Sequence, residues 1–166
     1  EYDASLDIMT DVIRHLTIIY REIFIGFLSG QFIKTNNGIK VIEFNVRPGD
    51  SEILNIVPIL KTDFVDICEA MIDRELHNIQ IEYEKKATVC KYIVNKGFPT
   101  PKEDIKMVID EKAIEEGGGD LFYSCFQVAE NVYKPSPRGV AVTAKGDTLN
   151  DAYQLCEKLI YDHIKG

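Results

Sequence analysis

Three polar side chains in the segment VIEFNVR have the types and the spacing to bind a cation next to an anion. Glu43, Asn45 and Arg47 occupy alternate positions of this segment, so in a strand a carboxylate, an amide and a guanidinium emerge from one face. Carboxylate and amide oxygens suit Mg²⁺, which completes its shell with substrate phosphates. Arginine can bind a phosphate or carboxylate through two parallel hydrogen bonds. The pattern predicts a cation site beside an anion clamp, although a half-exposed strand shows the same alternation without any function.

A predicted hairpin brings a fourth polar residue to this site. Residues 23–34 and 39–46 have strand patterns, and the Thr-Asn-Asn-Gly sequence between them favours a turn because Asn and Gly accept positive φ. If the loop comprises residues 36–38, the numbers of paired residues sum to 74 and Gln31 lies opposite Glu43. A one-residue change of register would place another residue there. On the first register, three residues are candidate ligands of one or two cations: Gln31, Glu43 and Asn45.

The next segment, RPGDSE, places two more carboxylates in a glycine-containing loop that leads into a helix. Free N–H groups at a helix N-terminus favour an anionic substrate. The same residue types also fit an ordinary turn followed by a capping box, with Asp50 or Ser51 as the cap. The sequence leaves both interpretations open at this point.

Composition and charge argue against several classes of function. The 166 residues carry a net charge of −8 with no basic block, which argues against a nucleic-acid partner. The absence of an apolar run of about 18 residues predicts no membrane span, and this stretch has no signal-peptide pattern. The four cysteines form no C-x-x-C pair, which indicates buried thiols in a reducing, cytoplasmic compartment.

The remaining pattern predicts an α+β fold in two domains, residues 1–80 and 84–166. In the first domain we expect a helix ending near Arg21, the hairpin, and helices over 52–60 and 63–74. One face of the hairpin should pack into a core, through Ile42, Phe44 and Val46. In the second domain we expect strands over 87–95, 105–109, 121–133 and 140–144, and turns over 96–99 and 135–139. A last helix should begin at Asp147-Thr148 and bury one side: Leu149, Ala152, Tyr153, Cys156, Leu159 and Ile160.

Four segments resemble, in order, segments of the phosphoribosylamine–glycine ligase family of the ATP-grasp superfamily. They are GFLSGQ (26–31), VIEFNVRPGDSE (41–52), CKYIVNKGFP (90–99) and GVAVTAKGDTL (139–149). The family carries E-F-N-x-R-[FL]-G-D-P-E after a G-x-L-x-x-G strand, and G-V-T-A-x-G-D-T-L near the end of its C-terminal domain. Most ATP-grasp enzymes share E-x-N, whereas R-x-G-D-x-E together with G-D-T-L is more specific. Pro48 stands where the family has Phe or Leu, and Ser51 where it has Pro.

This resemblance implies a site and a reaction. Glu43 and Asn45, with Gln31, would bind Mg²⁺ or Mn²⁺. The acceptor loop, which we define as residues 47–52, would bind substrate through Arg47, Gly49, Asp50 and Glu52, with Arg47 and Asp50 catalytic. The reaction would join glycine to 5-phosphoribosylamine at the expense of ATP, through a glycyl phosphate, in purine biosynthesis.

The resemblance also implies missing partners. Residues 1–80 would end the ATP-grasp domain and residues 84–166 would form the C-terminal domain. The chain begins at Glu1 without Met, and we expect the N-terminal and nucleotide-gripping lobes to lie elsewhere in the same protein. The chain alone should then be inactive. Two alternatives stay open: another ATP-grasp ligase or carboxylase, or a non-catalytic assembly module that kept the fold.

Overall fold

The computed structural model describes residues 2–99 and 106–166, and only the backbone of residues 135–137. The chain forms two compact units. The first unit comprises Glu1–Asp50 and Thr62–Ile81, and the second comprises Ser51–Lys61 and Glu82–Gly166. The chain therefore passes between the units three times, the last time at the predicted boundary near residue 80. The assignment of 1–80 and 84–166 to two domains of an enzyme stays a prediction.

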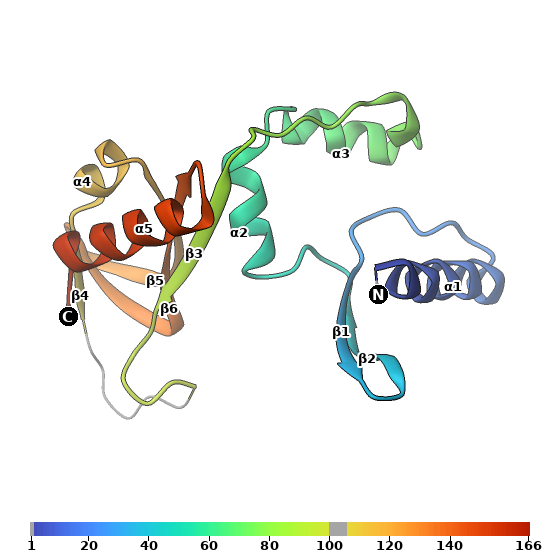
Figure 1. Ribbon diagram of the computed structural model, residues 1–166, viewed down its shortest axis with the longest axis horizontal. Helices are drawn as coiled ribbons and strands as arrows, with labels where there is room; N and C mark the ends of the chain where they lie inside the picture. Colours follow the sequence, from blue (N-terminus) through green and yellow to red (C-terminus); the bar gives the residue numbers. More distant parts are fainter. Residues whose placement is uncertain (1, 100–105) are drawn as a thin grey trace. The chain divides into compact units, whose positions relative to one another are not determined.

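The first unit contains a long helix, a hairpin and a shorter helix in the predicted order (Figure 1). Helix α1 (Tyr2–Tyr20) ends where the sequence predicts, because Arg21 adopts a φ of 55°, a left-handed conformation that often ends helices. Helix α3 (Phe64–Ile72) begins after the predicted cap Asp63, whose carboxylate accepts a backbone N–H of the first turn. A 3₁₀ turn, η2 (Leu76–Asn78), follows.

The hairpin is shorter than predicted. Strand β1 (Ser29–Thr35) pairs with β2 (Gly38–Asn45), and the prediction of strand from residue 23 is wrong. Residues 23–26 instead line a groove together with α1, and Gly26 has a φ of 146°, outside the extended region. At the other end of the hairpin, Pro48 has no N–H with which to extend the ladder.

The register joins Gln31 to Glu43 as predicted, but by a different route. Thr35 pairs with Gly38, so the loop has two residues and the predicted three-residue loop is wrong. The residue numbers of that pair sum to 73. A β-bulge at Ile42 then shifts the register by one residue, so that the numbers of Gln31 and Glu43 sum to 74. The predicted cross-strand pair is therefore confirmed, and it forms because of the bulge.

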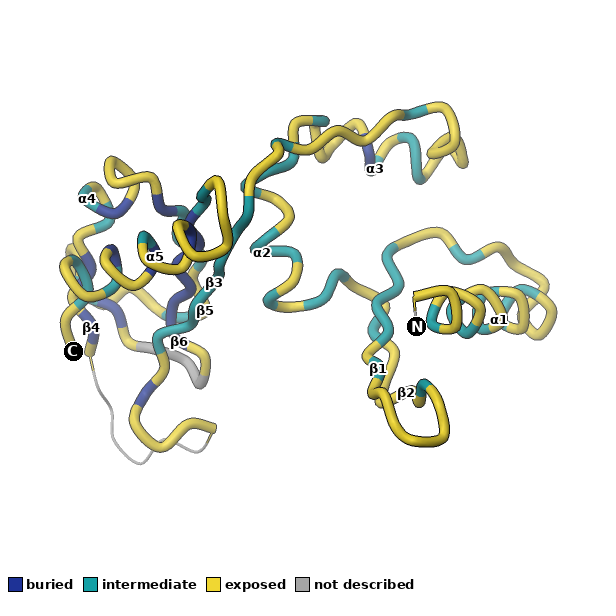
Figure 2. Tube along the Cα trace, viewed as in Figure 1, coloured by how far each residue is buried: buried dark blue, intermediate teal, exposed yellow. Residues whose placement is uncertain are grey.

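Few side chains of the first unit are buried (Figure 2). Among its described residues, Ile67 on α3 is the one buried side chain, at 7% exposure. The prediction that one face of β2 packs into a core is wrong for this unit, since Ile42, Phe44 and Val46 are 60%, 38% and 77% exposed. Two strands alone form no second layer, so a hairpin face is covered only where another element packs on it.

The second unit is an antiparallel sheet covered by helices. The strands run in the order β3-β6-β4-β7, and β5 also pairs with β6. Their bounds are β3 (Ala87–Ile93), β4 (Met107–Ile109), β5 (Gly119–Ala129), β6 (Val132–Gly146) and β7 (Ile164–Lys165). The helical elements are α2 (Glu52–Ile56), η1 (Val57–Ile59), α4 (Glu111–Glu116) and α5 (Leu149–His163). This mixture of helices and antiparallel strands confirms the α+β class.

The core lies between this sheet and helices α4 and α5. Ile109, Ile114, Val142 and Cys156 are fully buried there. Burial raises the pKa of the Cys156 thiol to about 11, so this thiol stays protonated at neutral pH. All four cysteines are free thiols, as predicted, but the prediction that they are buried holds for Cys156 alone, since Cys68, Cys90 and Cys125 are partly buried. None of the helices in the described ranges is both long and apolar enough to cross a bilayer.

Two features of the second unit differ from the sequence prediction. Helix α4 was not predicted, because six residues are too few to show a clear helical period. Its N-cap is Asp110, whose carboxylate accepts the Ala113 N–H. The predicted turn over 135–139 is wrong as well: β6 continues through it, and residues 136–138 form a bulge with no partner on β5. The predicted strand start at residue 105 lies outside the described residues.

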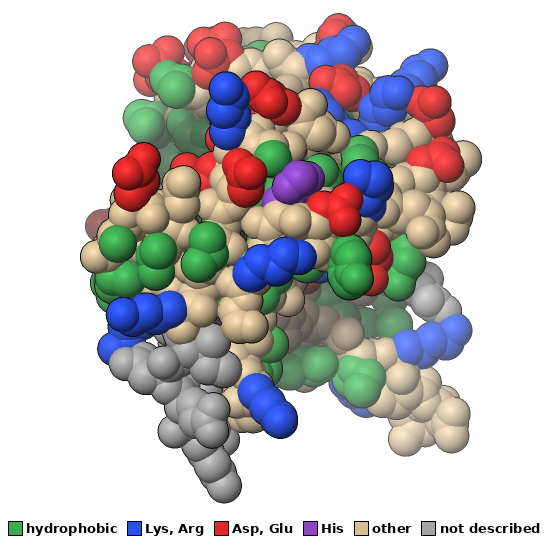
Figure 3. Space-filling model, turned by 90° about the vertical axis from the view of Figure 1, so that its left-hand side faces the viewer, with side chains coloured by type: hydrophobic (Ala, Val, Ile, Leu, Met, Phe, Trp, Pro, Cys, Tyr) green, Lys and Arg blue, Asp and Glu red, His purple; other side chains and the backbone are tan. Residues whose placement is uncertain are grey.

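Helix α5 buries Ala152, Cys156 and Leu159 as predicted, but two residues expected inside lie outside. Leu149 is 66% exposed because it starts the first turn, and Tyr153 is 42% exposed. The Tyr153 ring lies 3.9 Å from the Lys91 ammonium, which makes a cation–π contact. Acidic and basic side chains are interspersed on the face shown in Figure 3. Exposed ion pairs of this unit include Lys158 with Asp162 on α5 and Lys112 with Glu116 on α4.

Helix α5 starts at the predicted cap Thr148, which forms a capping box with Asp151. The Thr148 hydroxyl accepts the Asp151 N–H at 3.2 Å, and the Asp151 carboxylate accepts the Thr148 N–H at 3.0 Å. Thr148→Ala is expected to lower the free energy of unfolding by about 1 kcal/mol. Thr148→Ser keeps the hydroxyl and should retain most of that stability. Urea unfolding followed by circular dichroism measures both variants, and equal losses in the two would contradict this role of the hydroxyl.

Candidate functional site

Glu43 and Asn45 lie on one face of β2, just beyond the bulge. The Asn45 side-chain amide donates a hydrogen bond to the Glu43 carboxylate at 2.9 Å. Glu43 is exposed, and Asn45 is partly buried. The carboxylate is therefore accessible from solvent, with one of its oxygens hydrogen-bonded to its neighbour.

Gln31 completes a group of three oxygen-bearing side chains across the hairpin. It is exposed on β1 and pairs directly with Glu43, which places the two side chains on the same face about 5 Å apart. One carboxylate and two amides are hard donors that fit Mg²⁺ or Mn²⁺. Among the side chains that the structure describes, no three His, Cys, Asp or Glu residues cluster to hold a metal ion. A cation here would therefore take most of its remaining ligands from phosphate and water.

Arg47 lies beyond the end of β2, in a bend of the chain. Its guanidinium donates a hydrogen bond to the Pro48 carbonyl at 3.0 Å, and the side chain is exposed. Gly49 is partly buried and Asp50 is exposed. The strand alternation that places Glu43 and Asn45 together thus stops before Arg47, whose position follows from the turn at Pro48.

The acceptor loop crosses from the first unit to the second between Asp50 and Ser51. Glu52 opens α2 in the second unit and is exposed. Ser51 stands at the N-cap position, but its side chain makes no capping hydrogen bond. The capping-box interpretation of this loop is therefore wrong for Ser51, and α2 with five residues is too short for a strong dipole.

An apolar groove of about 590 Å³ lies elsewhere in the first unit. Residues of α1 and of the segment before β1 line it, among them Leu6, Met9, Ile13, Phe24 and Leu28. None of the predicted cation ligands or loop residues belongs to its lining. The candidate site is thus separate from this groove, and its Gln31 and Glu43 side chains are exposed on the hairpin.

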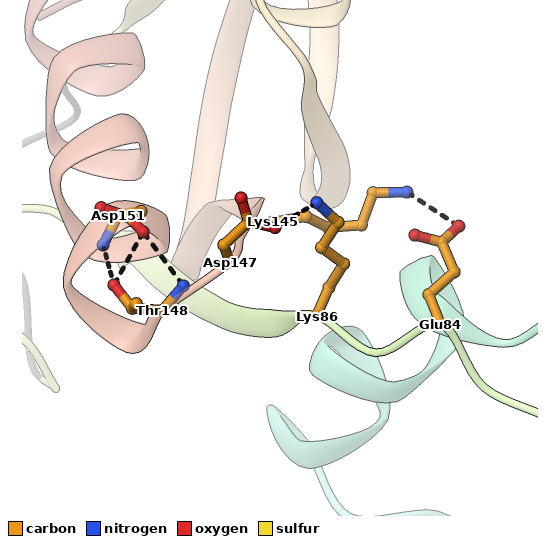
Figure 4. A network of polar contacts seen from close by, with 6 residues as sticks. All are labelled: Glu84, Lys86, Lys145, Asp147, Thr148 and Asp151. Atoms are coloured by element: carbon orange, nitrogen blue, oxygen red, sulfur yellow. Dashed lines mark hydrogen bonds and ion pairs between the residues drawn. The ribbon is translucent and has the colours of Figure 1, made fainter.

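The G-D-T-L segment of the resemblance has a structural explanation. A side chain at Gly146 would place its Cβ 2.4 Å from the backbone nitrogen of Ala152, so only glycine lets β6 approach the first turn of α5. Asp147 forms an ion pair of 2.5 Å with Lys86 (Figure 4), and Thr148 caps the helix. These residues therefore shape the junction between β6 and α5.

The ion pair of Lys86 and Asp147 contributes to stability over a definite range of pH. The hydrogen bond to Asp147 raises the pKa of Lys86, and the hydrogen bond to Lys86 lowers the pKa of Asp147. The contribution of Asp147 to stability is lost as the pH falls through its folded pKa, and that of Lys86 as the pH rises through its own. Both residues stay charged across neutral pH, and the pair is exposed enough to contribute little.

Lys145, next to this segment, was not singled out by the sequence analysis. Its ammonium donates to the Pro58 carbonyl at 3.1 Å and lies 3.5 Å from the Glu84 carboxylate. No sequence signal marks a lysine whose partners stand so far away along the chain. A surface lysine on a strand end is the ordinary interpretation of such a residue.

Comparison with curated proteins finds phosphoribosylamine–glycine ligases among the relatives of this chain. The chain is 43% identical over 143 residues to a phosphoribosylamine–glycine ligase of Methanococcus maripaludis, which covers 85% of this chain and 32% of that protein. It is 38% identical over 160 residues to the ligase of the same name from Methanocella arvoryzae, covering 95% of this chain and 36% of that protein. The chain thus spans about a third of the length of these relatives. No protein-family model matches it.

Solved structures show the same fold at low sequence identity. A phosphoribosylamine–glycine ligase from Thermotoga maritima has a TM-score of 0.64 at 19% identity, covering 84% of this chain and 34% of that one. The N5-carboxyaminoimidazole ribonucleotide synthetase of the same organism has a TM-score of 0.55 at 18% identity, covering 98% and 41%. At this identity the likeness shows the fold alone.

Proposed function

The chain belongs to the phosphoribosylamine–glycine ligase family of ATP-grasp ligases, and from that membership we propose that it forms part of an enzyme joining glycine to 5-phosphoribosylamine. The products are glycinamide ribonucleotide, ADP and phosphate, and the step belongs to purine biosynthesis. The intact ligase, by which we mean this chain together with an ATP-binding lobe, is the active species. The chain alone is inactive on this proposal.

The pairing of Glu43 with Asn45 and Gln31 is the observation that carries the proposal. Three oxygen donors converge on the open face of a hairpin, in the segment that resembles the family signature. An open face suits a site whose remaining ligands arrive with ATP. A divalent cation bound there would neutralise charge on the transferring phosphoryl group.

The residues of this chain would contribute orientation and charge rather than covalent chemistry. On the proposal, Asn45 holds the Glu43 carboxylate toward the cation, and Arg47 exchanges the Pro48 carbonyl for an anionic substrate group. Gly49, Asp50 and Glu52 line the acceptor position. Glycine is phosphorylated on its carboxylate, and the amine of phosphoribosylamine then displaces phosphate from the acyl phosphate. Rate enhancement by such positioning alone can be large.

The substrate requirement of the intact ligase tests the proposal. ADP formation is expected to need both glycine and phosphoribosylamine, and glycinamide ribonucleotide should appear in equal amount with ADP. The 166-residue chain alone should form no ADP above background. A coupled ADP assay with each substrate omitted in turn makes the measurement. Turnover with bicarbonate or formate in place of glycine would instead indicate a different ATP-grasp ligase.

A further inference from the structure

Side-chain hydrogen bonds fasten the segment Ser51–Lys61, which contains α2 and η1, to the sheet of the second unit. The Thr88 hydroxyl on β3 donates to the Asn55 carbonyl at 3.0 Å, and the Lys145 ammonium on β6 donates to the Pro58 carbonyl at 3.1 Å. Thr88 and Lys145 are direct cross-strand partners, so both reach the segment from the same face of the sheet. The segment is thus held to the sheet through its backbone carbonyls.

Lys145 also contacts the part of the chain that re-enters the second unit at Glu82. Its ammonium lies 3.5 Å from Glu84, and Figure 4 shows the lysine reaching toward that carboxylate. Beside it, the Glu84 N–H donates to the Ile59 carbonyl at 2.7 Å, and Leu60 forms a bridge with Tyr83. The Lys145 side chain therefore joins β6 both to the segment Ser51–Lys61 and to Glu84, near the start of the later part of the second unit. About two thirds of that side chain is shielded from water, which strengthens its polar contacts.

The segment and the face of the sheet that binds it contain two unsatisfied oxygens, which is costly if stability is the sole purpose of their arrangement. The side-chain oxygens of Asn55 and Thr143 are buried without a hydrogen-bond partner, and the strand register places Thr143 on the face that carries Lys145. A buried unsatisfied oxygen costs on the order of 1–3 kcal/mol. Apolar packing would hold the segment without that cost. Local conflicts of this kind gather where position matters for function.

We infer that Lys145 is a positioning residue of the proposed ligase: it fixes the segment Ser51–Lys61, and with it the Glu52 end of the acceptor loop, to the C-terminal sheet. The inference rests on the proposed function of that loop. The loop begins in the first unit at Arg47 and continues in the second from Ser51. Its shape therefore depends on how firmly the second unit holds its later half.

Lys145→Met in the intact ligase tests this role through a selective kinetic effect. Methionine keeps the aliphatic length but donates nothing to the Pro58 carbonyl. The KM for phosphoribosylamine is expected to rise about 10-fold, since small displacements of positioning groups are costly, while the KM for ATP stays within about twofold. Lys145→Arg restores a donor and should recover most of the affinity. Amide hydrogen exchange should accelerate at Leu60 and Glu84 in the methionine variant alone.

Lys91→Met is the matched control. Lys91 pairs with Glu157 at 2.5 Å and lies over Tyr153, within the same unit and with similar exposure, but contacts no part of Ser51–Lys61 among the described interactions. It should affect stability similarly and leave the KM for phosphoribosylamine unchanged. A Lys145→Met enzyme with wild-type KM values would overturn the inference. Absence of glycine-dependent turnover in the wild type would instead overturn the proposed function, and hydrogen exchange would then decide alone whether Lys145 holds the segment.

Discussion

Glu43→Ala in the intact ligase is expected to lower kcat by at least about 100-fold. Removal of a residue that merely orients a metal ligand typically costs 10- to 100-fold in activity or metal affinity, and Glu43 is the one carboxylate of the predicted cation site. The loss should be larger at low metal concentration, because the two amides that remain bind a cation weakly. Steady-state kinetics across a titration of Mg²⁺ or Mn²⁺ measures both effects.

Two further variants make this result specific to the site. Glu69→Ala removes an exposed carboxylate of α3 in the same unit and should leave kcat unchanged. Glu43→Gln keeps the size of the side chain and an acceptor for the Asn45 amide, yet it removes the charge, so it should lose nearly as much activity as alanine. Full activity of Glu43→Ala at all metal concentrations would favour a non-catalytic assembly module instead.

Ile109→Ala is expected to lower the free energy of unfolding of the second unit by about 2–5 kcal/mol. Ile109 is fully buried in the core cluster, and truncation there removes buried apolar area and leaves a cavity. For a unit of roughly 100 residues, each 1 kcal/mol lowers Tm by about 4–8 °C. Thermal unfolding followed by circular dichroism should therefore show a fall of about 10 °C or more.

Val108→Ala provides the comparison on the same strand. Val108 is 50% exposed, so its truncation should lower Tm by only a few degrees, on the order of 1 kcal/mol or less. If the two variants unfold at the same temperature, burial on β4 does not control the stability of this unit. Urea unfolding of both variants gives the free energies directly.

The sequence predicts best those features that depend on local chemistry. The cap at Thr148 and the turn between β1 and β2 follow from the residue types at the position itself, and the end of α1 follows from the end of its apolar period at Tyr20. The pairing of Gln31 with Glu43 was also predicted, although its stated reason was wrong. The loop is one residue shorter than predicted, and the bulge at Ile42 adds one residue to β2. These two changes shift the register in opposite directions, so the predicted pair is kept. Pattern alone does not reveal a bulge, because an extra residue alters pairing without altering composition.

Other features depend on contacts between distant segments. The exposure of Phe44 and Val46 shows that an apolar face is buried only if some element covers it. The contact from Lys145 to Pro58 joins residues 87 positions apart in the sequence, and nothing in the neighbourhood of either residue signals it. The geometry of Glu43 and Asn45 was predictable because strand alternation is local, whereas the position of Arg47 depends on the turn at Pro48.

The triple crossing of the chain between the units has a practical consequence for dissection of this protein. A truncated protein that starts at Glu82 would lack Ser51–Lys61. Tyr83 would then lose its bridge to Leu60, and Thr88 its hydrogen bond to the Asn55 carbonyl. Conversely, a protease that cuts within residues 62–81 would sever the covalent link while the shorter peptide stays bound by its carbonyl contacts. Such a nicked protein would keep its mass under native conditions and separate into two pieces only in denaturant.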